Sequence, residues 1–137
     1  MTRILIVDDE PSVLGLLKSV LELEAFEIES AKSAAEAKLR LLEKNFDIVV
    51  TDMRMETPTA GFDVVRAAKQ LQPRPAIAIL TAFPISSAEW RPSGADALMV
   101  KGAEIMNLPD KLRSLLKARP QSELAARTAS GKDAQSH

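Results

Sequence analysis

The sequence predicts an α/β fold: a doubly wound parallel sheet of five strands between two layers of helices. Short apolar runs alternate with segments of helical periodicity, and this alternation occurs five times within residues 1–118. Most of the runs are apolar throughout, which is typical of parallel strands that are buried on both faces. Because crossovers between parallel strands are right-handed, only a few doubly wound topologies remain.

The expected strands are short and rich in β-branched residues. In chain order they are 4–7 (ILIV), 26–30 (FEIES), 48–50 (IVV), 76–80 (AIAIL) and 97–100 (ALMV). The segment FEIES alternates apolar and polar side chains, so we expect it to be a half-buried strand at the edge of the sheet.

Helical segments follow four of these strands. Pro11 suits the first turn of a helix over 11–24. Ser33 and Glu36 have the spacing of a capping box, which begins the second helix. Further helices are expected over 61–71 and 108–118. The residues that share an apolar face are Val13, Leu17, Val20 and Leu21 in the first helix, Ala34, Ala37 and Leu41 in the second, and Val64, Val65, Ala68 and Leu71 in the third.

The segment between the fourth and fifth strands departs from this pattern. Its sequence, TAFPISSAEWRPSGAD, contains Pro84 and Pro92, which bracket at most a short helix over 86–91. We therefore expect a short or irregular fourth helix. Residues 119–137 are small and polar without an apolar stripe, so we expect a disordered tail after a single domain over residues 1–118.

The composition excludes several classes of function. The chain has 18 basic and 19 acidic residues, which gives no footprint for direct nucleic-acid binding and no polybasic membrane patch. The absence of cysteine excludes disulfides, thiolate catalysis and cysteine-ligated metals. No apolar run approaches the roughly 20 residues that span a bilayer, and the N-terminus lacks the pattern of a secretory signal. We expect a cytoplasmic protein.

Polar side chains collect where the predicted strands end. They are Asp8, Asp9 and Glu10 after the first strand, Asp52 after the third, Thr81 after the fourth and Lys101 after the fifth. In doubly wound sheets, ligands bind beyond the carboxyl ends of the strands. Converging carboxylates repel one another unless a cation joins them, and an all-oxygen site suits Mg²⁺. A carboxylate nucleophile, a metal, a hydroxyl and an ammonium group are the components of phosphoryl transfer.

Each of these residues alone also has a purely structural interpretation. The acidic run could cap a helix, Asp52 could belong to a turn, Thr81 could simply end its strand, and Lys101 could be a solvated surface lysine. The presence of all of them at four strand ends on one edge of the sheet favours a functional site.

Residues 3–118 resemble the receiver domain of two-component response regulators. The segments that match are ILIVDDEP, DIVVTDMRM, AIAILTA and GADALMVK, in the order and spacing of that family. The resemblance implies a flavodoxin-like (βα)5 three-layer sandwich with strand order 2-1-3-4-5. It implies a signalling domain that catalyses only its own phosphorylation and dephosphorylation, and not a turnover enzyme.

The resemblance also implies roles for individual residues. Asp52 matches the aspartate that accepts a phosphoryl group from the phosphohistidine of a histidine kinase in a Mg²⁺-dependent reaction. Asp9 matches a direct metal ligand, Asp8 a ligand through water, and Arg54 the residue whose backbone carbonyl binds the metal. Thr81 and Lys101 match the hydroxyl and the ammonium group that contact the phosphoryl group.

Other implied features concern regulation and partners. The side chains of Arg54 and Phe83 match positions that tune the lifetime of the phosphorylated state. Leu98 and Trp90 lie in the region that matches the output face. The implied partners are a sensor histidine kinase or a histidine phosphotransfer protein, and a downstream protein that the sequence does not identify.

The chain departs from the family at four places. Glu56 stands where proline is usual and adds a negative charge near the site, and Gly61 comes one residue late, as after a one-residue insertion. Leu98 replaces an aromatic switch residue. Lys101 is followed by Gly102 instead of proline, so a cis peptide is not expected there.

Other interpretations stay open at this point. The chain is either a stand-alone receiver or a receiver excised from a longer protein, and it could be a protein-interaction module that signals without phosphorylation. A haloacid-dehalogenase-type phosphatase would need an aspartate two residues after its nucleophile, where this chain has Arg54. A flavodoxin is disfavoured because the first loop, DDEPS, is acidic where a flavin phosphate needs hydroxyls and free amides.

Overall fold

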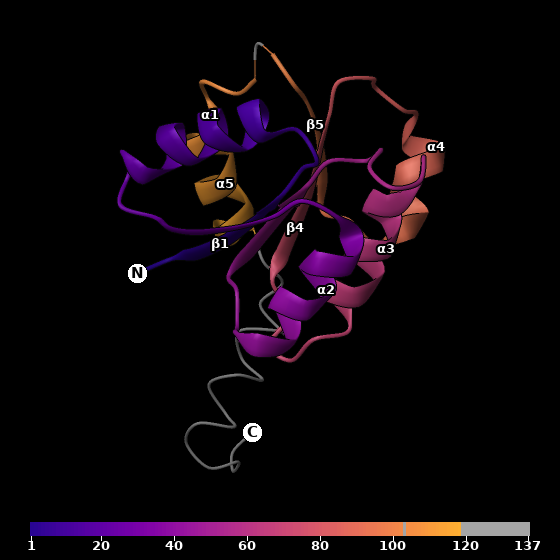
Figure 1. Ribbon diagram of the computed structural model, residues 1–137, viewed down its shortest axis with the longest axis horizontal. Coiled ribbons are helices and arrows are strands. Elements are labelled where there is room, and N and C mark those ends of the chain that lie inside the picture. Colours follow the sequence, from indigo (N-terminus) through magenta and orange to yellow (C-terminus); the bar gives the residue numbers. More distant parts are fainter. Residues whose placement is uncertain (103, 119–137) are drawn as a thin grey trace.

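The computed structural model of the protein describes residues 1–102 and 104–118 and contains one parallel sheet between two layers of helices (Figure 1). The strands are β1 (Arg3–Val7), β2 (Glu27–Ala31), β3 (Ile48–Thr51), β4 (Ala76–Thr81) and β5 (Ala97–Val100). Their order is β2-β1-β3-β4-β5. This confirms the predicted flavodoxin-like fold and strand order.

Five α-helices cover the two faces of the sheet. They are α1 (Pro11–Glu22), α2 (Ala34–Glu43), α3 (Ala60–Lys69), α4 (Ser87–Trp90) and α5 (Leu108–Lys117). Helices α1 and α5 lie on one face, and α2, α3 and α4 lie on the other (Figure 1). The expected tail, residues 119–137, lies outside the described residues.

Alternate residues of each central strand enter opposite cores, as the two-residue period of a strand requires. On β1, Ile4 and Ile6 pack with α1 and α5, whereas Leu5 and Val7 pack with α2 and α3. Both sets are almost completely buried. This explains why β1, β3 and β4 are apolar without alternation, and why the edge strand β2 is only half-buried over its first four residues.

The buried faces of the helices differ slightly from the predicted ones. The buried face of α1 is formed by Leu14, Leu17 and Leu21, while Val13 and Val20 are half-buried beside it. Ala34, Ala37 and Leu41 of α2 are buried as predicted. In the third helix Val64, Val65 and Ala68 are buried, but Leu71 lies beyond the end of α3 and is half-buried.

The fourth helix is short, as predicted. Helix α4 is a single turn, and a 3₁₀ turn over Arg91–Ser93 follows it directly. Ser86 and Glu89 form a capping box at its start, and Trp90 at its end is buried in the core beside α3. In the described part of the chain, no helix is both long and apolar enough to cross a membrane.

Candidate functional site

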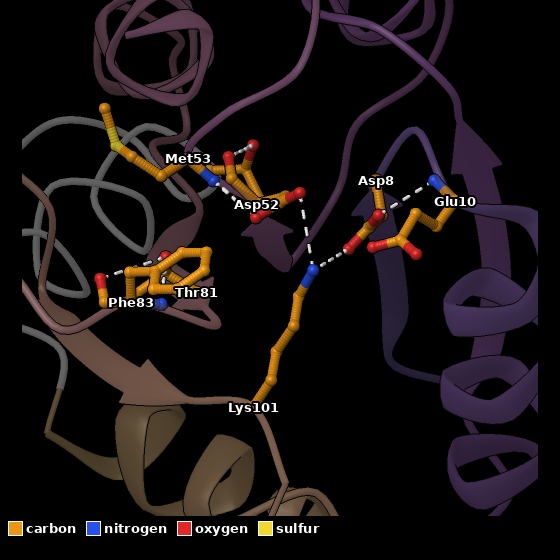
Figure 2. A network of polar contacts seen from close by, with 8 residues as sticks. Asp8, Glu10, Asp52, Met53, Thr81, Phe83 and Lys101 are labelled. Atoms are coloured by element: carbon orange, nitrogen blue, oxygen red, sulfur yellow. Dashed lines mark hydrogen bonds and ion pairs between the residues drawn. The ribbon is translucent and has the colours of Figure 1, made fainter. Parts of the chain in front are cut away.

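The carboxyl ends of four strands bring the predicted polar residues together at one edge of the sheet. Figure 2 shows Asp8, Glu10, Asp52, Thr81 and Lys101 among them. The sheet ladder fixes two of them through the backbone. The Asp52 amide donates to the Val7 carbonyl at 2.8 Å, and the Lys101 amide donates to the Thr81 carbonyl at 2.8 Å. These side chains therefore start from rigid positions one residue beyond the paired strands.

Lys101 joins the two buried carboxylates of the site. Its Nζ lies 2.6 Å from Asp8 Oδ2 and 3.3 Å from Asp52 Oδ2 (Figure 2). The remaining oxygens are held by backbone amides. Asp8 Oδ1 accepts from the Glu10 amide at 3.0 Å, and Asp52 Oδ1 accepts from the Met53 amide at 2.8 Å.

The surroundings shift the protonation equilibria of this group. Burial raises the pKa of Asp52, and the neighbouring charge of Asp8 raises it further, while Lys101 acts in the opposite direction. For Lys101, burial favours the neutral amine, but the hydrogen bond to Asp8 and the charges of both carboxylates outweigh burial and raise its pKa. Lys101 therefore stays charged, and added positive charge near Asp52 would favour its ionised form.

Three carboxylates are placed to hold a metal ion. Oxygen atoms of Asp8, Asp9 and Asp52 lie within 4.8 Å of one another, with Asp8 and Asp52 buried and Asp9 exposed. An all-oxygen donor set open to solvent on one side fits Mg²⁺, which keeps several of its waters. Beside it is a cavity of about 140 Å³, lined by Asp9, Glu10, Asp52, Arg54, Thr81, Ala82, Phe83 and Lys101. The residues present therefore fit a divalent cation.

The Thr81 hydroxyl is engaged in a local turn. It accepts from the Phe83 amide at 3.2 Å and lies 3.3 Å from the Phe83 carbonyl (Figure 2). The Phe83 side chain is 65% exposed, and the guanidinium of Arg54 lies 5.7 Å from the centre of its ring. This stacked pair borders the cavity.

A close backbone contact explains why a glycine stands at position 61, one residue later than is usual in the family. The first turn of α3 packs against the backbone of the nucleophile candidate, and the Gly61 amide donates to the Met53 carbonyl at 2.8 Å. A Cβ at this position would lie 2.4 Å from the Asp52 carbonyl oxygen and 2.8 Å from Met53 Cα. No side chain fits this contact, so the glycine stays at the contact while the loop before it lengthens.

Glu56 binds a helix and does not line the cavity. Its carboxylate accepts from the Ala34 amide at 2.9 Å and from the Ala35 amide at 3.1 Å, at the N-terminus of α2. The small degree of burial acts to raise the pKa of Glu56, but these backbone hydrogen bonds outweigh it and lower the pKa. From the sequence we predicted that this charge lies near the site, but we did not predict its contact with α2.

The predicted output residues lie on the β4–β5 side of the molecule. Leu98 on β5 is half-buried and packs against the same core as Trp90. Gly102 has φ of +104°, a conformation that favours glycine. The cis peptide found in residues 1–102 and 104–118 is Gln72–Pro73. The Lys101–Gly102 peptide is therefore trans, as predicted.

Comparisons with known proteins agree with this geometry. The response regulator receiver domain matches residues 4–113 of the chain. The response regulator protein PilR of Pseudomonas aeruginosa is 30% identical over 126 residues, which cover 90% of this chain. That alignment spans 28% of the length of PilR, and the alignments to several further curated relatives span 31% to 56% of their lengths.

Solved structures give the same family. The response regulator TrrA of Thermotoga maritima, in complex with Mg²⁺-BeF, is 32% identical with a TM-score of 0.75, over 84% of this chain and 99% of TrrA. TrrA in complex with the histidine kinase ThkA gives 33% identity and a TM-score of 0.74, over 85% and 99%. A CheY-like receiver domain protein of Methanospirillum hungatei is 28% identical with a TM-score of 0.78, over 85% and 94%. The chain belongs to the response regulator receiver domain family of two-component systems.

Proposed function

We propose that this receiver accepts a phosphoryl group on Asp52 from the phosphohistidine of a histidine kinase, in a Mg²⁺-dependent reaction. The observation that carries the proposal is the Asp52 carboxylate itself. It is buried at a strand end, held by the Met53 amide and Lys101, and accompanied by Asp8 and Asp9 at metal-binding distance. A histidine kinase is bound to TrrA in one of the related structures, which supports this choice of donor.

The transfer balances as a substitution at phosphorus. An oxygen of the Asp52 carboxylate forms the new P–O bond while the P–N bond to the donor histidine breaks, and the electron pair returns to the imidazole nitrogen. Lys101 supplies positive charge beside the phosphoryl oxygens, and the Thr81 hydroxyl donates to one of them after leaving its turn. Water later attacks phosphorus and releases phosphate, which returns Asp52 to its carboxylate form.

In this proposal Asp9, Asp52 and the backbone carbonyl of Arg54 would hold the metal, and Asp8 would bind it through water. When bound there, Mg²⁺ would supply positive charge beside the oxygens of the carboxylate and of the incoming phosphoryl group. Asp8 also keeps the Lys101 ammonium beside Asp52 through its 2.6 Å ion pair.

The stacked Arg54 and Phe83 side chains act as modulators of the phosphate lifetime. They come from two different loops, contact each other and both line the cavity. Shielding the acyl phosphate from attacking water would slow its hydrolysis.

The output of the proposed reaction is a shift between two conformations. Movement of Thr81 towards the phosphoryl group would alter the segment that leads to α4, where Trp90 packs, and the neighbouring strand that carries Leu98. A histidine kinase or a histidine phosphotransfer protein supplies the phosphoryl group. The change of conformation then passes the signal to a downstream partner protein. A cytoplasmic location and a role without turnover of other substrates stay predictions.

A second function, partner binding without phosphorylation, is favoured by the output region. Helix α4 has a single turn and β5 lacks an aromatic residue, so this region differs from the usual pattern of the family. A receiver of this kind could bind its partner without phosphorylation.

Mass spectrometry of the intact protein after incubation with acetyl phosphate and Mg²⁺ separates the two functions. We expect a gain of one phosphoryl group in the wild type, and no gain with Asp52→Asn or after removal of Mg²⁺ with EDTA. A wild type that gains no mass, or an Asp52→Asn variant that gains as much, would refute the first function.

A further inference from the structure

Glu56 connects two segments that are far apart in sequence. Its two carboxylate oxygens accept from the Ala34 and Ala35 amides, 22 and 21 residues away along the chain. Ser33 Oγ accepts from the Glu36 amide at 3.0 Å. The first-turn amides of α2 are therefore shared between a local cap and a carboxylate from another loop. A negative charge at a helix N-terminus is also favoured by the helix dipole.

The contact restrains the loop that follows Asp52. At its start, the buried Met53 side chain and the bond from the Gly61 amide to the Met53 carbonyl fix the backbone. Three residues later, Glu56 is fixed to α2, and the Met55 amide donates to the Thr57 carbonyl at 3.0 Å. Arg54 lies between these two anchors.

The carbonyl of Arg54 is available to a ligand. In residues 1–102 and 104–118, no backbone amide is hydrogen-bonded to it. Arg54 also lines the cavity beside the carboxylates. Within the described residues no backbone hydrogen bond fixes Arg54 itself, so we infer that its position depends on the contacts of Met53 and Glu56 on either side.

The geometry points to Glu56 as a positioning residue for the metal: by tying the β3–α3 loop to α2, it holds the Arg54 carbonyl at the site of Asp8, Asp9 and Asp52. This inference rests on the magnesium site of the proposed function. Groups that orient metal ligands from outside the coordination sphere usually change affinity by about 10- to 100-fold when they are removed. Since the loop keeps its Met53 anchor, we expect the low end of that range.

The test compares Glu56→Ala with Ser33→Ala. Both substitutions remove a cap from the N-terminus of α2, but only the first releases the loop. Mg²⁺ affinity is measured by calorimetric titration. We expect the dissociation constant to rise about 10-fold in Glu56→Ala and to change less than about 2-fold in Ser33→Ala. Glu56→Gln keeps one acceptor oxygen and should fall between them, and it replaces Glu56→Ala if that variant does not fold.

A second readout is independent of the metal. Hydrogen exchange of the Met55 amide, measured without Mg²⁺, should be faster in Glu56→Ala than in the wild type and unchanged in Ser33→Ala. Equal effects of the two substitutions on exchange and affinity would reduce Glu56 to a helix cap and overturn the inference. A wild type that binds no Mg²⁺ would overturn the proposed metal site, and the role of Glu56 with it. A wild type that binds Mg²⁺, with unchanged affinity in Glu56→Ala, would overturn the role of Glu56 alone.

Discussion

The two loops that flank Asp52 are held in very different ways. The β3–α3 loop, residues 52–59, is tied to α3 through Met53 and Gly61 and to α2 through Glu56. The β4–α4 segment, residues 82–86, has a local turn closed by the Thr81 hydroxyl, and its Phe83 side chain is largely exposed. One loop is anchored to two helices, whereas the other is held by its local turn and by the half-buried Ile85, which packs against the core.

We infer from this difference that one loop holds reacting groups in fixed positions and the other moves during the reaction. The anchored loop carries Asp52 and the Arg54 carbonyl, the groups that the proposed function requires to be in place before the reaction. The turn of the β4–α4 segment is closed by the Thr81 hydroxyl at the end of β4, which in the proposed reaction breaks these local bonds to reach a phosphoryl group. Segments with few tertiary contacts are the ones that open or move at low cost in free energy. The predictions below weaken one side or the other, from the largest expected effect to the smallest.

Gly61→Ala should disrupt the anchored loop most. The added Cβ meets backbone atoms of Asp52 and Met53 and has no flexible side chain to displace. We expect a loss of about 2–3 kcal/mol in the free energy of unfolding, measured by denaturant titration, and slower phosphorylation.

Gly15→Ala is the matched control for this substitution. Nothing lies within 4 Å of a Cβ at that position in α1. Since alanine is the better helix former, this variant should gain about 0.5–1 kcal/mol. Similar losses in both variants would show that the contact of Gly61 with Asp52 is not what the fold requires.

Lys101→Met should leave two buried carboxylates facing each other without their cation. Breaking a buried ion pair typically costs about 3–5 kcal/mol, and this site is open to water on one side, so we expect about 2 kcal/mol in the absence of metal. Mg²⁺ supplies the missing charge, so the rise in Tm on adding Mg²⁺ should be larger in the variant than in the wild type. A smaller rise would mean that Lys101, and not repulsion between Asp8 and Asp52, controls metal binding.

Glu56→Gln should cost about 1 kcal/mol at neutral pH, as for the loss of a helix cap. The pKa of Glu56 is lower in the folded chain than its ordinary value of 4.5, because backbone amides of α2 stabilise the charged form. The stabilisation is therefore present above that value and is lost as the pH falls through the lower, folded-state pKa. Chemical unfolding of both proteins should give a difference at neutral pH that shrinks as the pH falls below 4.5 and through the lower, folded-state pKa. A difference that is constant with pH would assign the effect to shape and not to charge.

Phe83→Ala should have the smallest effect on stability, within about 0.5 kcal/mol, because its ring is exposed. Its expected effect is kinetic. Loss of the ring and of its stacking with Arg54 should accelerate decay of the phosphorylated protein by several-fold, followed by mass spectrometry after removal of acetyl phosphate. Leu39→Ala, at another exposed apolar side chain, is the control. An unchanged decay rate in Phe83→Ala would exclude shielding by this ring.

Much of this site follows from local patterns in the sequence. The acidic run after β1, Asp52 after β3 and Lys101 after β5 are visible because parallel strands place their carboxyl ends on one edge. The short α4 is visible because proline cannot continue a helix. These features need only strand ends and residue types.

Contacts between distant segments were not predictable in the same way. Glu56 caps a helix 22 residues earlier in the chain, and a cap from another loop leaves no periodic signal. The sequence likewise gave no sign that Lys101 lies closer to Asp8 than to Asp52, or that the Thr81 hydroxyl closes its own turn. The late Gly61 was noticed as a departure, but its reason is the close approach of α3 to the Asp52 backbone.

The most direct test is to place a phosphoryl mimic on Asp52 and observe the two loops. Beryllofluoride with Mg²⁺ is added to the ¹⁵N-labelled protein, and the amide signals of Phe83 and Met55 are followed by NMR, together with their hydrogen exchange. We expect the Phe83 amide to lose its Thr81 acceptor, with a shifted signal and faster exchange, while the Met55 amide keeps its slow exchange. In Asp52→Asn the Phe83 amide should show neither the shifted signal nor the faster exchange. A wild type whose Phe83 amide does not respond, or an Asp52→Asn variant that responds equally, would contradict the account.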